Sequence, residues 1–152
     1  MGSFHERAFI LSTGDEIVTG QLQDTNAKYF AERLMDAGVL PVEHAAVQDS
    51  LADLVAALRR GIAAAPLVIM SGGLGPTDGD LTRQALCELL GDTLVLDEGA
   101  RTALTDKLAR RGRDVTERQL RQVFRPSRAR CLDNEFGTAP GLHVVARVEQ
   151  SQ

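Results

Sequence analysis

The chain has 152 residues, the length of one ordinary domain, and 43% hydrophobic and 25% charged residues, a balance typical of a globular protein. Only 4% of the residues are aromatic, which argues against stacking platforms for single-stranded nucleic acid. Cys87 and Cys131 lack the spacing of a zinc site or a disulfide framework. The longest apolar run, residues 62–70, is too short to span a membrane, and the N-terminus has no signal-peptide pattern. We therefore expect a soluble, cytoplasmic protein without a membrane partner.

The net charge of −4 is unevenly distributed along the chain. Residues 101–130 include ten basic and three acidic side chains, a net charge of 10 − 3 = +7. Such a segment is typical of a solvated helical surface, and less often of a surface that binds phosphate or nucleic acid. We favour the solvated surface and do not expect nucleic acid as a partner.

Strand and helix patterns alternate from the beginning of the chain. The predicted strands are short apolar runs at residues 8–12, 39–47, 66–70 and 142–148. The predicted helices have apolar residues at helical spacing and cover residues 25–37, 51–62, the segment after Thr77 as far as Leu90, 97–111 and 116–124.

Local signals support several of these boundaries. Thr25 or Asp24 can cap the first helix, and Ser50 with Asp53 and Thr116 with Gln119 have the spacing of capping boxes. The run 66–70 is continuously apolar, which is typical of a central parallel strand covered on both faces. The alternation predicts an α/β fold, a three-layer α/β/α arrangement with a mostly parallel sheet, and residues 1–152 as a single domain.

Open α/β sheets bind ligands beyond the carboxyl ends of their strands, and three loops of this sequence follow such ends: 13–26, 47–49 and 71–80. In the third loop, glycines 72, 73 and 75 permit positive φ angles and a close approach of the backbone to a ligand, and a helix begins after them. This arrangement suits a phosphate. The loop matches neither the Rossmann nor the P-loop fingerprint, and the alternative is a tight turn closed by a Thr77/Asp80 capping box.

These loops also contain four carboxylates: Asp15, Glu16, Asp49 and Asp80. If they converge, a divalent cation, a ligand ammonium or a bound proton must offset their repulsion. A cation that bridges carboxylates and phosphates is one interpretation, and hydrogen bonds from carboxylates to a heterocycle are another. A third interpretation is that Asp15 and Asp49 only cap loops. The scattered histidines are interpreted as structural: His5, His44 and His143.

Three stretches together resemble the molybdopterin-binding domain of the MoaB/MogA type, in the form found as the N-terminal half of CinA proteins. They are TGDEIVTGQLQDTN at 13–26, SGGLGPTDGDLT at 71–82 and NEFGTAPG at 134–141. The resemblance implies a three-layer α/β/α domain that usually forms a homo-oligomer. In MoaB/MogA relatives the pocket binds molybdopterin.

The resemblance also implies roles for individual residues. Asp80 matches an essential aspartate of the family and Asp49 a second pocket aspartate. The residues that it places in the ligand pocket are Gly72, Gly73, Gly75, Thr77, Asp49, Asn26, Gly137 and Thr138. In CinA relatives the same pocket is linked to metal-dependent cleavage of ADP-ribose into AMP and ribose 5-phosphate. This activity implies Asp80 as a metal ligand, with Asp15 or Glu16 as further catalytic residues.

Three functions follow from these observations. The first is hydrolysis of an ADP-ribose-like nucleotide with a divalent cation, the second is molybdopterin binding in molybdenum cofactor biosynthesis, and the third is a non-catalytic nucleotide-sensing or interaction module.

Two departures from the family pattern bear on these functions. Gly79 replaces one of two consecutive acids before Leu-Thr, and Asp78 is displaced by one position, which bears on metal-dependent hydrolysis. The family pattern also continues past residue 141 into a further strand, turn and helix, so we expect a truncated or short form. The separate deamidase domain of CinA has no counterpart in this sequence, and we do not predict deamidase activity.

Overall fold

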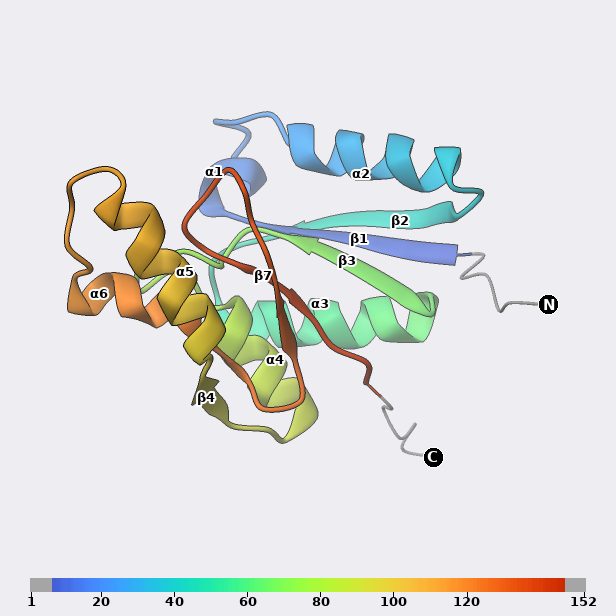
Figure 1. Ribbon diagram of the computed structural model, residues 1–152. Coiled ribbons are helices and arrows are strands. Elements are labelled where there is room, and N and C mark those ends of the chain that lie inside the picture. The colour runs from blue at the N-terminus through green and yellow to red at the C-terminus, as the bar shows by residue number, and fades with distance from the viewer. Residues whose placement is uncertain (1–6, 147–152) are drawn as a thin grey trace. The chain divides into compact units, whose positions relative to one another are not determined.

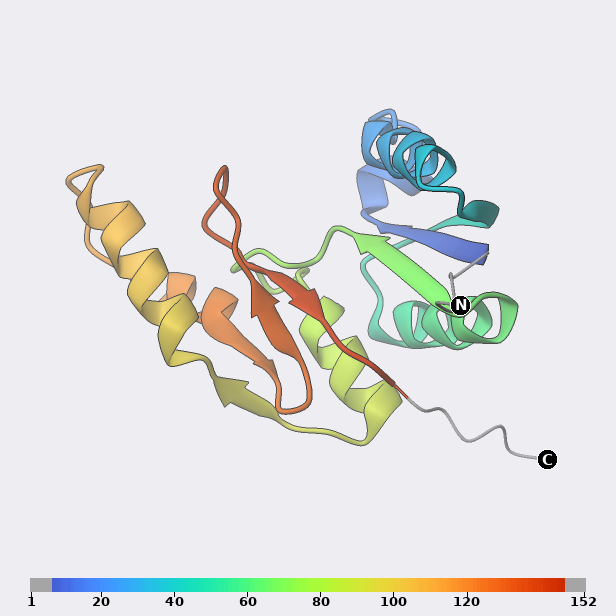
Figure 2. The same ribbon diagram turned by 45° about the vertical axis from the view of Figure 1, so that its right-hand side comes forward.

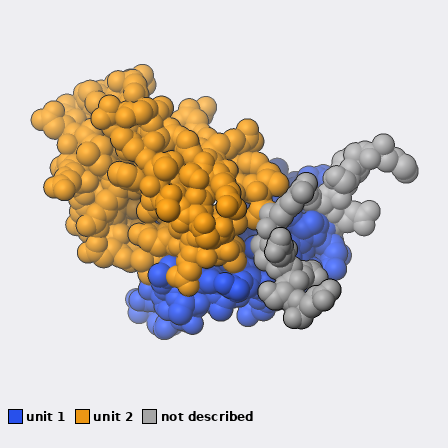
Figure 3. Space-filling view, turned by 90° about the horizontal axis from the view of Figure 1, so that it is seen from below, with its two compact units in different colours: residues 1–73 blue, residues 74–152 orange. Residues whose placement is uncertain are grey.

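The computed structural model describes residues 7–146 (Figure 1). The chain divides into two compact units, residues 1–73 and residues 74–152 (Figure 3). His5 lies outside the described residues, and the single-domain organisation stays a prediction. No helix in the described part of the chain is long and apolar enough to cross a membrane.

Unit 1 is built around a three-stranded parallel sheet in the order β2-β1-β3. Its strands are β1 (Arg7–Thr13), β2 (Leu40–Val47) and β3 (Leu67–Ser71). The central strand is β1, whose residues after Arg7 are all buried. The structure differs here from the prediction for residues 66–70, because β3 pairs with β1 alone among the described strands and its residues are only partly buried. A continuous apolar run is therefore not sufficient to place a strand at the centre of a sheet.

Helices cover both faces of this sheet, with α2 (Thr25–Asp36) on one side and α3 (Leu51–Ala64) on the other (Figure 1). Side chains alternate along β1 between these two helices. Ile10 packs in a cluster with Ala27 and Leu34 of α2, whereas Phe9 lies against Gly61 of α3, where an added Cβ would be 2.8 Å from the ring. The predicted α/β fold with a parallel sheet is confirmed, and unit 1 has three layers.

The cap of α2 also joins this helix to β2. Asp24 accepts a hydrogen bond of 2.9 Å from the N–H of Ala27, so Asp24 rather than Thr25 is the cap. The Asp24 carboxylate lies 3.0 Å from Nε2 of His44 on β2, which gives His44 a structural contact. Burial alone would raise the pKa of Asp24, but hydrogen bonds from Ser12, Ala27 and His44 and the charge of His44 hold it below its ordinary value.

Unit 2 combines short helices with two antiparallel ribbons, β4-β5 and β6-β7 (Figure 2). Its elements are α4 (Thr82–Leu90), β4 (Leu94–Leu96), α5 (Glu98–Ala109), α6 (Glu117–Leu120), η1 (Arg121–Val123), β5 (Phe124–Pro126), β6 (Arg130–Leu132) and β7 (Gly141–His143). Leu104 and Leu108 of α5 pack against Val123 to form its buried cluster. The predicted strand 142–148 corresponds to β7, and its last two residues lie outside the described part.

The predicted helix 116–124 is much shorter in the structure. The capping box of Thr116 and Gln119 is present and starts α6. The chain then turns through η1, and Phe124 begins β5, where it pairs with Leu96 of β4. This pairing with a strand almost thirty residues earlier overrides the local helical pattern, because long-range packing outweighs intrinsic propensity.

Asp92, in the turn after α4, is expected to make the stability of the protein depend on pH. Its Oδ1 accepts hydrogen bonds from the Ser127 hydroxyl (2.6 Å) and the Thr93 N–H (2.7 Å), and its Oδ2 accepts one from the Arg128 N–H (3.0 Å). The Ser127 hydroxyl and these N–H groups lower the pKa of Asp92 from 3.8 to about 2. Because the folded pKa is depressed, this stabilisation is complete above about pH 4 and is lost as the pH falls to about 2.

We therefore expect Asp92→Asn to be less stable than the parent protein at pH 7 and equally stable near pH 2, as measured by urea denaturation. Asp114→Asn is a matched control, because Asp114 is exposed and its side chain has no hydrogen bond or ion pair within residues 7–146. A stability difference between Asp92→Asn and the parent that stays constant with pH would contradict the prediction.

Candidate functional site

The carboxyl ends of β1 and β2 bring two of the predicted carboxylates together in unit 1. Thr13, the last residue of β1, donates its hydroxyl to Asp49 Oδ1 over 2.8 Å. The backbone N–H of Asp49 in turn donates to Asp15 Oδ1 over 3.1 Å. Parallel strands end at the same edge of a sheet, so this proximity follows from the fold. Both carboxylates therefore hold the backbone and side chains of the loops in place.

The remaining predicted residues of unit 1 lie at the same edge of its sheet. Asn26, in the first turn of α2, donates its side-chain amide to the Ser71 hydroxyl at the end of β3 over 2.8 Å. The Glu16 carboxylate folds back over Gly14, where an added Cβ would lie 2.8 Å from Glu16 Oε1. The edge thus carries exposed amide and carboxylate groups from α2 and the short helix α1 (Asp15–Val18).

Gly72 and Gly73 both have positive φ angles, 103° and 65°. A Cβ on Gly72 would lie 2.4 Å from the carbonyl oxygen of Thr13. A side chain at position 72 would therefore collide with the backbone of β1. The close backbone approach predicted at this glycine is thus made to the protein itself.

In unit 2, Asp80 organises the rest of the glycine-rich loop. Its Oδ1 accepts the N–H of Gly75 over 2.7 Å, and its Oδ2 accepts the N–H of Thr77 over 2.7 Å and also the Thr77 hydroxyl. A Cβ on Gly75 would lie 2.7 Å from Asp80 Oδ2, so the absence of a side chain at this position allows the carboxylate to approach. Asp80 does not cap α4, because Leu81 is in the cap position.

The hydrogen bonds of Asp80 limit the kind of metal site that it can form. A carboxylate has about four acceptor positions, and Gly75 and Thr77 occupy three of those of Asp80. Within residues 7–146, no group of three or more His, Cys, Asp or Glu side chains could hold a metal ion. These residues do not fit a site in which protein groups alone coordinate a cation. They fit an ion like Mg²⁺ that takes one carboxylate from the protein and its other ligands from phosphates and water.

Arg83 is the buried centre of the unit 2 site, with an exposed fraction of 3%. Its guanidinium donates to four backbone carbonyls: Leu74 at 2.5 Å, Phe124 at 3.0 Å, Gln122 at 3.1 Å and Gly75 at 3.3 Å. Burial lowers the pKa of Arg83 despite the opposing charge of Asp80. Arg83 cannot be recognised from the sequence, because an arginine in a short helix is ordinarily exposed and no local pattern distinguishes this one.

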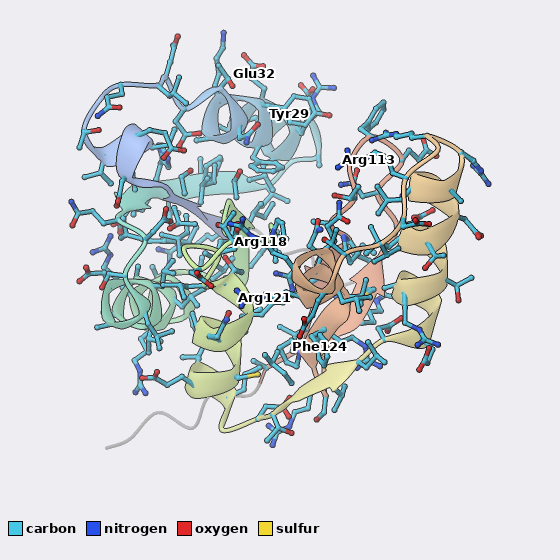
Figure 4. The ribbon with its side chains drawn as sticks, turned by 90° about the vertical axis from the view of Figure 1, so that its left-hand side faces the viewer. Tyr29, Glu32, Arg113, Arg118, Arg121 and Phe124 are labelled. Atoms are coloured by element: carbon cyan, nitrogen blue, oxygen red, sulfur yellow. The ribbon has the colours of Figure 1, made fainter. Side chains whose placement is uncertain are left out.

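A groove of about 380 Å³ lies beside this loop in unit 2. Its lining includes Gly75, Thr77, Asp80, Leu94, Arg121 and Phe124. Arg121 and Phe124 lie along the segment that runs from α6 into β5 (Figure 4). The groove therefore combines a cationic side chain, polar loop groups and an apolar wall. Arg121 is a further candidate, which no sequence pattern distinguishes from the other basic residues of the segment 101–130.

Gly137 and Thr138 are held in place by hydrogen bonds within unit 2. The side chain of Asn134 accepts the N–H of Gly137 over 3.1 Å and donates to the carbonyl of Ala139 over 2.8 Å. The Thr138 hydroxyl donates to the side-chain oxygen of the buried Gln122 over 2.8 Å. Gln122 directly follows Arg121, so these hydrogen bonds connect the 134–141 motif to the segment that carries Arg121.

A second groove, of about 470 Å³, lies in unit 1. Its lining comes from α2 and β2 and includes Asp24, Lys28, Ala31, Pro41 and His44. It follows the body of β2, and Asp24 is its one lining residue from the loop 13–26. None of the predicted catalytic or ligand-binding residues lines this groove.

Comparison with known proteins identifies a family for nearly the whole chain. The family model described as "Probable molybdopterin binding domain" matches residues 9–149. A CinA-like protein from Anaeromyxobacter sp. (strain Fw109-5) is 43% identical over 141 residues, which are 92% of this chain and 34% of that protein. A CinA-like protein from Geobacter sulfurreducens is 42% identical over 89% of this chain and 33% of that protein. The chain thus spans about a third of the length of these curated relatives.

Solved structures agree with this result. The crystal structure of CinA from Thermoplasma acidophilum superposes with a TM-score of 0.81 at 33% identity, covering 90% of this chain and 80% of that one. The tungsten cofactor synthesizing protein MoaB from Pyrococcus furiosus superposes with a TM-score of 0.57 at 21% identity, covering 72% and 69%. The likeness to MoaB concerns the fold alone.

Proposed function

Because the chain belongs to the family described as "Probable molybdopterin binding domain", we propose that it binds a phosphate-bearing small molecule in the groove of unit 2. The observation that carries this proposal is the position of Arg121 opposite the loop that Asp80 holds in place. A guanidinium binds phosphate oxygens through charge-assisted hydrogen bonds with a fixed geometry. Leu94 and Phe124 provide an apolar wall for the organic part of the ligand.

Our first candidate ligand is an ADP-ribose-like nucleotide, which the domain hydrolyses to AMP and ribose 5-phosphate. Water adds to one phosphorus of the diphosphate, and the bond from that phosphorus to the bridging oxygen breaks. Arg121 binds the negative charge of the phosphates, and Asp80 keeps the Gly75–Thr77 loop ordered beside them. Asp80 would hold a divalent cation through its remaining acceptor position, and such a cation would supply additional charge stabilisation for the phosphates. This candidate follows from the resemblance to CinA proteins, and the relatives with CinA-like names are the ones that share it.

Our second candidate ligand is molybdopterin, whose phosphate uses the same cationic groove. The description of the matching family and the fold shared with MoaB favour this candidate. A pterin that copurifies with the protein gives a characteristic fluorescence after oxidation, whereas bound ADP-ribose does not. This measurement separates the two ligands without enzymatic activity.

The test of the first candidate is incubation of the chain with ADP-ribose and individual divalent cations, with AMP detected by mass spectrometry. We expect AMP with the parent protein and at least about a hundredfold less with Asp80→Ala, since removal of an interaction specific to the site typically costs about 3 kcal/mol. Asp114→Ala, which removes an exposed carboxylate far along the sequence in the α5–α6 loop, is the control and keeps the parental rate. The absence of AMP with every cation would exclude the hydrolase and leave pterin binding or a non-catalytic nucleotide-sensing or interaction module.

Asp80→Ala also has a predicted effect on stability. The N–H groups of Gly75 and Thr77 lose their acceptor, and because Thr77 is exposed water replaces part of the lost hydrogen bonding. We expect a free energy of unfolding lower by about 1–2 kcal/mol and an unchanged far-ultraviolet circular dichroism spectrum. A variant that fails to fold would show that Asp80 is needed for structure, and loss of activity would then not identify a binding role.

A further inference from the structure

We propose that Asp78 is a built-in competitor for the phosphate of the ligand. In the groove of unit 2 its carboxylate pairs with Arg121, and a diphosphate replaces it there. This inference rests on the proposed function, because it concerns the same groove, and it adds the group that the anion displaces.

The contact between Asp78 and Arg121 joins the two walls of the groove. Nη1 of Arg121 donates to Asp78 Oδ1, and both side chains line the groove. Asp78 is 90% exposed and Arg121 58% exposed, so ligand and solvent can reach both partners. Asp78 directly follows Thr77, whose backbone is fixed by Asp80. The loop therefore presents the Asp78 carboxylate at the position where an anionic ligand would meet Arg121.

The local charge leaves this part of the groove positive. The hydrogen bond and the charge of Arg121, and then the charge of Arg118, hold the pKa of Asp78 below its ordinary value. Arg118 and Arg121 lie on one side of the same short segment (Figure 4). The lining of the groove sets Asp78 and Asp80 against Arg83 and Arg121, so the charge of Arg118 beside it is the one that remains uncompensated. A diphosphate carries enough negative charge to neutralise both cations, whereas Asp78 cannot.

The strength of the ion pair suits a displaceable contact. An exposed ion pair changes an equilibrium constant by about fivefold at most. A phosphate that accepts two parallel hydrogen bonds from a guanidinium forms a stronger and more specific interaction. The exchange of Asp78 for a diphosphate is therefore favourable, and the residual competition of Asp78 lowers the affinity for weakly charged anions. The apolar Leu94 and Phe124 in the same groove favour a diphosphate that carries an organic group.

Gly79, where the chain departs from the pattern it resembles, directly follows Asp78. Position 79 is a glycine in this chain, and the acid at position 78 is the one that contacts Arg121. This chain therefore uses the loop carboxylate in a contact with its own cation.

The experiment is isothermal titration calorimetry of the full 152-residue chain with inorganic pyrophosphate and, separately, with ADP-ribose, each without added metal. We expect Asp78→Asn to bind pyrophosphate about two- to fivefold more tightly than the parent protein, because the competing ion pair is lost. We expect Arg121→Gln to bind it at least about tenfold more weakly, because a charge-assisted hydrogen bond is lost. Asp114→Asn and Arg113→Gln, which change exposed residues of the α5–α6 loop that do not line the groove, keep the parental affinity.

The two ligands distinguish failure of this inference from failure of the proposed function. Unchanged pyrophosphate affinity in either Asp78→Asn or Arg121→Gln, or no binding even in Asp78→Asn, overturns the inference. If pyrophosphate follows the expected order while ADP-ribose neither binds nor is cleaved, the anion site stands and the proposed nucleotide ligand is wrong. An equal loss of affinity in Arg113→Gln and Arg121→Gln would show general attraction to the basic segment and would also overturn the inference.

Discussion

Gly72→Ala is expected to lower the free energy of unfolding by about 3 kcal/mol. The φ angle of Gly72 is +103°, and a Cβ would lie 2.4 Å from the Thr13 carbonyl oxygen and 2.7 Å from Thr13 Cγ2. A positive φ costs an alanine about 1–2 kcal/mol, and overpacking against backbone that cannot move aside adds about 1–3 kcal/mol. Urea denaturation with circular dichroism detection measures the change directly.

Gly38→Ala separates these two costs. Gly38 follows α2 with a φ angle of +75°, and an added Cβ would have no neighbour within 4 Å. We expect this control to lose only the conformational part, about 1 kcal/mol. Equal losses in the two variants would show that Thr13 does not restrict position 72. The positive φ angle alone would then explain the glycine at position 72, and not its packing against Thr13.

The sequence predicted the features that depend on neighbouring residues. Asp24, Ser50 and Thr116 each cap a helix through a hydrogen bond to a group three residues ahead, so their short spacing is visible in the sequence. Gly91 ends α4 in a left-handed conformation, which glycine adopts at little steric cost and which is a common end of helices. The three stretches that resemble the family, 13–26, 71–82 and 134–141, also predicted which loops carry the candidate site.

The features that the sequence did not predict depend on contacts between distant segments. The choice of β1 over β3 as the central strand is decided by pairing with β2, which approaches from the other side. The end of the helix predicted for 116–124 is decided by the pairing of Phe124 with Leu96. In each case the local apolar pattern fits more than one position, and only the tertiary partner distinguishes them.

The candidate site shows the same division. The strand-end rule predicted that the loops after β1 and β2 would meet, and Asp15 and Asp49 are joined there. The pairing of Asp78 with Arg121 joins residues 43 positions apart, and nothing in the basic segment 101–130 marks Arg121 among its neighbours. Whether Asp49 and Asp80 serve one ligand stays a prediction from the resemblance.

Arg83→Met is expected to lower the free energy of unfolding by about 3–4 kcal/mol. Methionine fills much of the space of the arginine but donates no hydrogen bond, so the carbonyls of Leu74, Gly75, Gln122 and Phe124 lose their shared donor. Each buried carbonyl left without a partner costs about 1 kcal/mol or more. Urea denaturation is the measurement, and Arg83→Lys, with a charge but fewer suitably placed donors, should lie between methionine and the parent protein.

Arg111→Met is the matched control, because Arg111 is exposed near the end of α5 and its side chain has no ion pair within residues 7–146. We expect this variant to remain within about 0.5 kcal/mol of the parent protein. If Arg83→Met were equally mild, the four carbonyls would not depend on the guanidinium. A large loss specific to Arg83 would show that one buried cation joins the start of the glycine-rich loop to the segment after Arg121. The buried side chain of Arg83 would then hold the two walls of the proposed anion groove in position.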